Sequence, residues 1–288
     1  MLVVIALVTG PVMAHESRLP LGDGKLSTAP KTGYVFACQP GFPGGGGAQV
    51  AGPWIKDGYW TPSAKPIVEG SARWPNARIS ITVEGSERVV RSNSLPTHET
   101  GEFPVRAGTN AYRYDRNPNS IGEKPVLLRM PAKPTVAAWP ACVPMGMIGF
   151  AVSGVAIFNA FDLQGRDAPA YEIQDKCNGH PEISSQYHYH DLSPCLKAAS
   201  PDVPVGWILD GFPILGPTDA KGRVYGSADL DACHGMTGPV MIDGRRVVTY
   251  HYRFTRDFPY TIGCFRGSPI AIERRRPPPP PMFPPPLR

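Results

Sequence analysis

Apolar and polar residues alternate in short runs along most of this chain, and turn-forming residues interrupt the runs every few positions. The segments QYHYH at 186–190 and TYHYRF at 249–254 alternate and are rich in aromatic residues, which is typical of β-strands. The stretch ARISITVEGSERVVRSNS at 77–94 predicts a hairpin that turns at Glu84-Gly85. Residues 33–142 show no strong helical period, so the pattern predicts a mainly β body.

The second half of the chain contains two similar segments. GFAVSGVAIFNAFDLQGR, which starts at Gly149, aligns with GWILDGFPILGPTDAKGR, which starts at Gly206, at matching glycine, isoleucine, aspartate and arginine positions. Farther along, DKCNGH aligns with DACHGM, and one YHY triplet aligns with another. This many matches in one order indicate a tandem duplication, with copies at about 146–195 and 203–264. Each copy opens on two apolar runs that flank a predicted turn at Ser153-Gly154 or Asp210-Gly211.

Composition favours short strands and turns over long helices. Hydrophobic residues make up 42% of the 288 positions, enough for a core, while 35 prolines and 31 glycines interrupt regular structure. No compositional break separates the two halves. We therefore expect one integrated domain at 33–270, with a mainly β, disulfide-stapled, β-sandwich-like fold and a tandemly duplicated C-terminal half.

Charge narrows the choice of partners. The net charge is +5, but four arginines of the C-terminal tail contribute to it, and without them the body is close to neutral. No basic face suggests a nucleic-acid partner.

The two ends of the chain differ from the body. MLVVIALVTGPVMA at 1–14 has a short apolar run and a small-residue cleavage pattern, which indicates a signal peptide although a basic start is missing. We expect a flexible N-terminus at 15–32, no membrane span after cleavage, and a periplasmic or secreted protein. The Arg- and Pro-rich segment 271–288 is expected to be a disordered, extended tail, and its partner is not indicated.

The six cysteines form an even set, which fits a disulfide framework in an oxidising compartment. In each copy, two cysteines flank the YHY triplet. Equivalent pairing within the copies therefore predicts the bridges Cys177–Cys195 and Cys233–Cys264, and it leaves Cys38 with Cys142. Pairing between the copies is the alternative.

The run Tyr187-His188-Tyr189-His190 is the main candidate for chemistry. Alternate side chains of a strand share a face, so His188 and His190 can reach one ion while the two tyrosines pack on the other face. His251 takes the place of His188 in the second copy, and His180 and His234 lie in the aligned CNGH and CHGM loops. If the copies pack about a pseudo-twofold axis, these histidines converge on one metal ion. The alternatives are hydrogen-bonded structural histidines and catalysis without a metal.

Copper is the ion we expect first and zinc second, because imidazole suits both and Met236 adds a soft ligand for copper. Asp175 and Asp231 can orient an imidazole from outside the ligand shell, or they can cap a local turn instead. The acidic residues Asp162, Asp167 and Glu172 fit no calcium loop.

Two metal-free functions compete with this prediction. TIGCFRG at 261–267 resembles the nucleophile motif of L,D-transpeptidases, which makes Cys264 a candidate thiol nucleophile with His251 as its base. A binding or scaffold protein of the cell envelope is the other option, with Trp54, Trp60 and Trp74 lining a carbohydrate or peptide surface.

The chain resembles the YHYH-domain family of exported bacterial proteins. EIQDKCNGHPEISSQYHYHDLSPCL, DGFPILGP and YHYRFTRDFPYTIGCFRG carry the resemblance, which extends over most of residues 36–267. It implies export, disulfides and Tyr187–His190 as the signature, but no particular reaction. Arg253 replaces a second histidine of the doubled motif, and Met236 stands where the first copy has His180, so we expect one asymmetric site.

Overall fold

The computed structural model describes residues 18–272. The predicted signal peptide at 1–14 and all but the first two residues of the predicted tail lie outside this range. Within it, the N-terminal stretch that we expected to be flexible contributes two short strands, β1 (Leu19–Pro20) and β2 (Leu26–Ser27). No helix of the described residues is long and apolar enough to cross a membrane.

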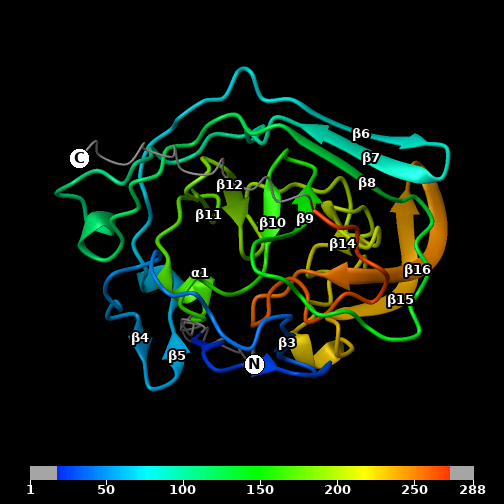
Figure 1. Cartoon of the computed structure of the whole chain (residues 1–288), viewed down its shortest axis with the longest axis horizontal. Helices are drawn as coiled ribbons and strands as arrows, with labels where there is room; N and C mark the ends of the chain where they lie inside the picture. The colour runs from blue at the N-terminus through cyan, green and yellow to red at the C-terminus, as the bar shows by residue number, and fades with distance from the viewer. Residues whose placement is uncertain (1–17, 273–288) are drawn as a thin grey trace, which may run out of the picture.

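An eight-stranded sheet forms the centre of the protein (Figure 1). Its strands, in chain order, are β9 (Met147–Ala151), β10 (Ala156–Phe158), β11 (Gly179–Pro181), β12 (Tyr187–Tyr189), β13 (Gly206–Ile208), β14 (Pro213–Leu215), β15 (Gly235–Ile242) and β16 (Arg245–Arg253). Their spatial order is β11-β12-β10-β9-β13-β14-β16-β15.

Counted inward from either edge, the strands follow the same order: the third, fourth, second and first strand of one segment. Each of the two predicted copies supplies four strands, and β9 pairs antiparallel with β13 where these two segments meet. In both halves the second strand of the copy pairs parallel with the fourth, as β10 does with β12 and β14 with β16. The two halves therefore fold alike, and their YHY triplets lie near opposite edges of the sheet.

The predicted turns contain glycines with the positive φ that such tight turns require. Gly154 and Gly211 close the β9–β10 and β13–β14 hairpins with φ of 82° and 88°. A side chain at Gly211 would also meet the carbonyl oxygen of Pro131 at 2.5 Å, so both strain and space exclude other residues there. The hairpin predicted at 77–94 is confirmed, since β6 (Ile79–Glu84) pairs with β7 (Glu87–Ser92) around Gly85.

Smaller elements cover the central sheet. β7 also pairs with β8 (Val126–Pro131) in a three-stranded sheet, drawn along the top of Figure 1, and Arg88 of β7 binds Asp243 of the β15–β16 turn through two hydrogen bonds. The remaining elements are β3 (Val35–Phe36), β4 (Ile55–Lys56), β5 (Tyr59–Trp60), α1 (Ala168–Tyr171) and the 3-10 turns Pro62–Ala64, Ala111–Arg113 and Ser227–Asp229. The prediction of a mainly β, sandwich-like body is confirmed.

Three disulfides staple this body. They join Cys38 to Cys142, Cys177 to Cys195 and Cys233 to Cys264, which are the pairs that the repeat singles out. All six cysteines of the sequence are therefore bridged. Cys264 is wholly buried in its bridge, so it offers no free thiol, and the thiol-enzyme alternative is wrong for this structure.

Candidate metal centre

The β11–β12 hairpin brings three histidines together. His180 of β11 and His188 of β12 are direct partners across the ladder, and His190 follows β12 by one residue. Their side chains lie on one face, because Tyr187 and Tyr189 occupy the alternate positions. One ring nitrogen of each of the three histidines lies within 4.8 Å of those of the other two.

Backbone carbonyls set the tautomers of two of these rings. The Nδ1 atom of His188 lies 3.1 Å from the carbonyl oxygen of Gln186, and that of His190 lies 2.5 Å from the carbonyl oxygen of Asn159. A carbonyl oxygen only accepts hydrogen bonds, so each Nδ1 carries the proton and donates it. In the neutral rings both Nε2 atoms then present lone pairs, and these two atoms are 3.1 Å apart.

Glu172 brings a carboxylate to the same point. Its Oε2 atom lies 3.2 Å from Nε2 of His190 and 3.3 Å from Nε2 of His180. Glu172 directly follows α1, and Lys65 fixes its backbone by donating from Nζ to the Glu172 carbonyl oxygen at 2.8 Å. The sequence alone placed Glu172 only among acidic residues that fit no calcium loop, and not beside the histidines. Its one signal was an acidic residue placed next to the apolar residues of APAYEI, eight positions before His180.

The cluster is buried. His180, His188, His190 and Glu172 expose 4%, 3%, 4% and 7% of their surfaces. Burial, together with the neighbouring histidines, holds the pKa of His188 well below its usual value. Burial alone would raise the pKa of Glu172, but His180 and His190 hold it well below its usual range. Glu172 is therefore a carboxylate, and it lies beside Nε2 of His190, whose other neighbour is Nε2 of His188.

These separations fit one metal ion. Two ligands that each lie about 2.0–2.1 Å from a tetrahedral ion are about 3.3–3.4 Å from each other. Three of the six separations among the ligand atoms of Glu172, His180, His188 and His190 are 3.1–3.3 Å, and the histidine nitrogens all lie within 4.8 Å of one another. Neither ring nitrogen of His180, nor Oε2 of Glu172, has a hydrogen-bond partner among the described residues. Three imidazole nitrogens and one carboxylate oxygen are ligands typical of a transition-metal ion.

The second copy contributes nothing to this cluster, contrary to the predicted convergence. His251 lies on β16, which four strands separate from β12, a distance on the order of 24 Å at the usual strand spacing. His234 is also buried elsewhere, with Nε2 3.0 Å from the Thr255 hydroxyl oxygen. The two copies meet at β9 and β13, the strands farthest from their histidines, so His251 and His234 lie outside the proposed ligand set.

The equivalent position in the second copy holds a different trio. Met236 faces His251 across the ladder, as His180 faces His188. Arg253 takes the place of His190 and donates from Nη1 to the carbonyl oxygen of Gly216 at 2.9 Å. The asymmetry that the sequence indicates is thus present, but the soft ligand expected at Met236 belongs to the half without the histidine cluster.

Asp175 and Asp231 cap turns. Asp175 accepts hydrogen bonds from the backbone N–H groups of Cys177 and Gly179 and from the Tyr187 hydroxyl. Asp231 accepts the equivalent bonds from Cys233, Gly235 and the Tyr250 hydroxyl. Both carboxylates bind backbone N–H groups and a tyrosine hydroxyl, on the face of the hairpin that carries the tyrosines. They therefore cap turns, as the alternative prediction stated, and do not orient an imidazole.

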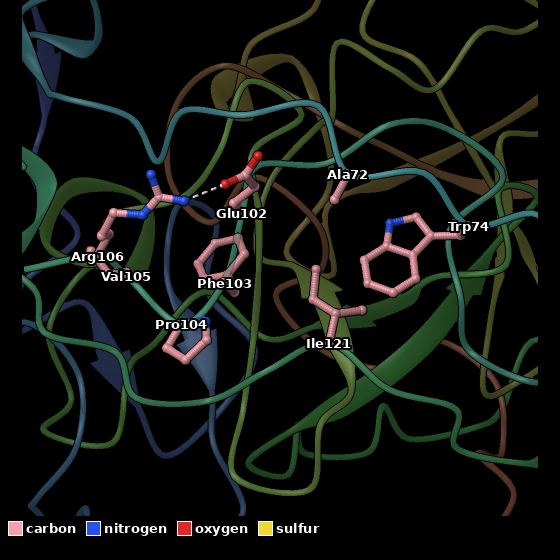
Figure 2. A pocket seen from close by; sticks show the side chains of 8 residues that line it. All are labelled: Ala72, Trp74, Glu102, Phe103, Pro104, Val105, Arg106 and Ile121. Carbon is pink, nitrogen blue, oxygen red and sulfur yellow. Dashed lines mark hydrogen bonds and ion pairs between the residues drawn. The ribbon is translucent and has the colours of Figure 1, made fainter.

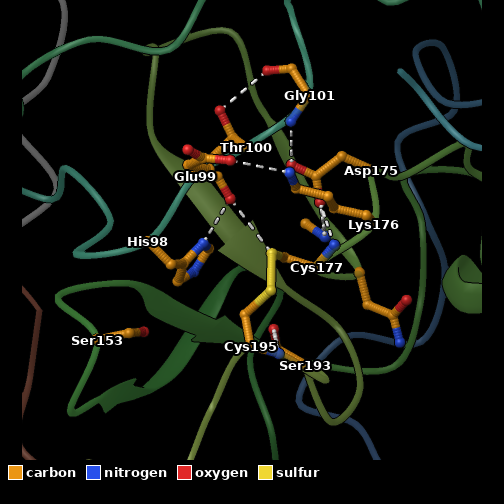
Figure 3. The surroundings of a disulfide bond; sticks show 12 residues. His98, Glu99, Thr100, Gly101, Ser153, Asp175, Lys176, Cys177, Ser193 and Cys195 are labelled. Carbon is orange, nitrogen blue, oxygen red and sulfur yellow. Dashed lines mark hydrogen bonds and ion pairs between the residues drawn. A yellow bond between two sulfur atoms is a disulfide. The ribbon is translucent and has the colours of Figure 1, made fainter. Parts of the chain in front are cut away.

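A disulfide closes the hairpin that carries the cluster. Cys177 precedes β11 and Cys195 follows β12, so the bridge encloses His180, His188 and His190. His98 lies beside the bridge (Figure 3), with Nδ1 2.9 Å from the Glu99 carbonyl oxygen and Nε2 2.5 Å from the Tyr189 hydroxyl. His98 and the two sulfur atoms are close enough to hold an ion, but the bridged sulfurs are not thiolates.

A separate pocket of about 450 Å³ has a mostly apolar lining, and no histidine belongs to that lining. Figure 2 shows Ile121 between Phe103 and Trp74, with the Glu102–Arg106 ion pair beside them. Of the three tryptophans that we considered for a binding surface, only Trp74 lines this pocket. Trp54 and Trp60 are each 4% exposed and belong to the core, so the predicted three-tryptophan surface is not formed.

Comparison with known families gives one match. The model of the family described as YHYH protein matches residues 127–224. This range includes Glu172, His180, His188 and His190, and it ends before the second YHY triplet. The match confirms the resemblance to the YHYH family. No curated protein and no solved structure matches the chain significantly.

Proposed function

We propose that this chain, whose residues 127–224 are of the YHYH protein family, is an exported protein that binds one transition-metal ion. His180, His188 and His190 would be its nitrogen ligands, and Glu172 would be its oxygen ligand. The ion would compensate the cluster's convergent lone pairs and negative charge.

One observation carries the proposal, namely the 3.1 Å contact between Nε2 of His188 and Nε2 of His190. Each Nδ1 donates to a carbonyl oxygen, so neither Nε2 carries a proton in the neutral rings. Two facing acceptors beside a carboxylate repel one another unless a cation lies between them. Carbonyl acceptors that orient imidazoles in this way are the usual outer partners of metal-bound histidines.

Copper is our first choice and zinc the alternative. Affinities of nitrogen and oxygen sites for divalent ions rise toward Cu²⁺ and fall again at Zn²⁺, so a site of this composition binds Cu²⁺ most tightly. Imidazole ligands also accept Cu⁺. The four ligands come from one hairpin and the residue after α1, and they are buried, so the ion would be a resident one that stabilises the fold.

Export is the second part of the proposal. Three disulfides among six cysteines suit an oxidising compartment, and the signal-peptide pattern at 1–14 is the predicted route there. An exported protein would also meet copper or zinc outside the cytoplasm.

The test is the metal content of protein purified from an oxidising compartment. We expect about one ion per chain by plasma mass spectrometry, and its loss in His188→Ala/His190→Ala. His251→Ala is the matched control, since it removes the equivalent buried imidazole of the other half and should keep the ion. Wild type without stoichiometric metal, even after incubation with Cu²⁺ or Zn²⁺, would contradict the proposal.

The pocket beside Trp74 supports a second candidate function, which is binding of an apolar small molecule without metal. Apart from Glu102 and Arg106, which form an ion pair, its lining is aromatic and aliphatic, and it contains no histidine. The dye 1-anilinonaphthalene-8-sulfonate is a suitable probe. Fluorescence enhancement by wild type that is lost in Trp74→Ala, and unchanged when chelator is added, would favour this function. No enhancement by folded wild type would remove it.

A further inference from the structure

Two methionines lie one residue away from the histidine cluster, each beside a residue that contacts a histidine ring. Met145 and Met147 flank Gly146 at the start of β9, and both side chains are half-buried, whereas the histidines are fully buried. This MGM segment is on the half of the sheet that holds the candidate metal centre. Met236, which we first considered as the soft ligand, is on the other half.

Asn159 connects Met145 to the cluster. Its side-chain Nδ2 lies 3.7 Å from the Met145 sulfur, and its carbonyl oxygen accepts the 2.5 Å hydrogen bond from Nδ1 of His190. A single residue therefore touches both the thioether of Met145 and the ring of His190.

Phe158 connects Met147 to the cluster. The ring of Phe158 stacks on that of His188, with centroids 3.9 Å apart. The β9–β10 ladder shifts register at Phe158, so that its partner is Met147 and not the fully buried Ile148. Paired residues of neighbouring strands lie side by side. Met147 is thus beside the ring that covers His188.

Thioether sulfur is a soft, uncharged ligand that selects Cu⁺ over Zn²⁺. We propose that Met145 and Met147 form an outer site for a soft monovalent cation, which receives Cu⁺ and passes it inward beside Phe158 to the Nε2 atoms of His188 and His190. Copper stays Cu⁺ throughout, so the transfer needs no oxidant or reductant. The outer site rests on the placement of Met145 beside Asn159 and of Met147 beside Phe158, whereas the inward transfer also rests on the proposed metal centre.

The outer site is tested with Ag⁺, a redox-inert probe of the same chemistry. In protein labelled with ¹³C at the methionine methyl groups, the signals of Met145 and Met147 should shift first as Ag⁺ is added. The measurement is repeated in His188→Ala/His190→Ala, which lacks the inner ligands. Shifts of these two methyl groups in both proteins are expected, and equal shifts at Met236 and Met241 would overturn the outer site.

The transfer is tested by the rate at which wild type takes Cu⁺ from a coloured Cu⁺ chelate. Met145→Leu/Met147→Leu preserves volume, so the fold should persist, and it should slow Cu⁺ uptake by about 10-fold or more while uptake of Zn²⁺ stays unchanged. Met236→Leu/Met241→Leu is the matched control, with two half-buried methionines of β15. Equal slowing for both ions, or none, would overturn the transfer. Wild type that binds Ag⁺ at the two methionines but never takes up a second, inner ion would refute the metal centre and leave the outer site standing.

Discussion

Nε2 of His188 and Nε2 of His190 face each other at 3.1 Å, and both rings donate their Nδ1 protons to backbone carbonyls. One positive charge between them satisfies both lone pairs. A metal ion supplies it, and so does a single shared proton, since Glu172 raises the pKa of His190 against the lowering effect of burial. The predictions below separate a metal site from a proton-bridged structural cluster.

The first prediction concerns the carboxylate ligand. Glu172→Gln keeps the size of the side chain but removes its charge, so affinity for Cu²⁺ should fall about 10–100-fold. Competition with a coloured chelator measures the affinity. Glu182→Gln is the control, because Glu182 lies on the same hairpin, in the turn before β12, and should leave affinity unchanged. Equal affinities of the two variants would show that Glu172 does not bind the ion.

The second prediction concerns the bridge around the hairpin. Replacing Cys177 and Cys195 by serine should lower the free energy of unfolding by about 3 kcal/mol, as expected for a loop of this length. It should also weaken metal binding, because the bridge fixes the ends of the hairpin that carries all three histidines. Urea unfolding and chelator competition measure the two effects.

The bridge Cys38–Cys142 is the control for that experiment. It spans 104 residues and lies outside the hairpin, so its removal should lower stability and leave metal affinity unchanged. If both double replacements weaken metal binding alike, the effect is one of general stability.

The third prediction tests the likeness of the two halves. Met236→His/Arg253→His gives the second half the three histidine positions of the first, with the carbonyl oxygen of Gly216 in the role of that of Asn159. We expect a second, weaker equivalent of Cu²⁺ by isothermal titration, since no carboxylate equivalent to Glu172 is added. Arg253→His alone should add none. A stoichiometry still at one in the folded double variant would contradict the likeness.

The fourth prediction is a pH dependence away from the candidate metal centre. Burial lowers the pKa of His234 from 6.5 to about 4, so the folded state holds this ring neutral where the unfolded chain protonates it. The stability that depends on the neutral His234 ring is complete above pH 6.5 and is lost as pH falls from 6.5 to 4. The total loss is on the order of 3 kcal/mol.

His234→Asn is the matched variant for this test. Asn178 takes the same position in the first copy with φ of 56°, close to the 72° of His234, so asparagine fits the backbone. Urea unfolding at pH 7 and pH 4.5 should show a smaller loss of stability in the variant than in wild type. An identical loss in both would assign the acid sensitivity to other groups.

Sequence patterns predicted several local features correctly. The alternation of Tyr187-His188-Tyr189-His190 placed both imidazoles on one face, because side-chain direction in a strand depends only on position parity. Glycine after an apolar run located the turns at Gly85, Gly154 and Gly211, and the flanking of each YHY triplet by two cysteines predicted the bridges. These features need few contacts from distant parts of the chain.

Only the tertiary structure decided which groups meet. The copies join through β9 and β13, so that His188 and His251 lie near opposite edges of the sheet although their sequences align. Glu172 reaches the cluster from the end of α1, and Met145 and Met147 reach its outer side through Asn159 and Phe158. Strand order and loop docking depend on the packing of the whole sheet, and the repeat in the sequence determines neither.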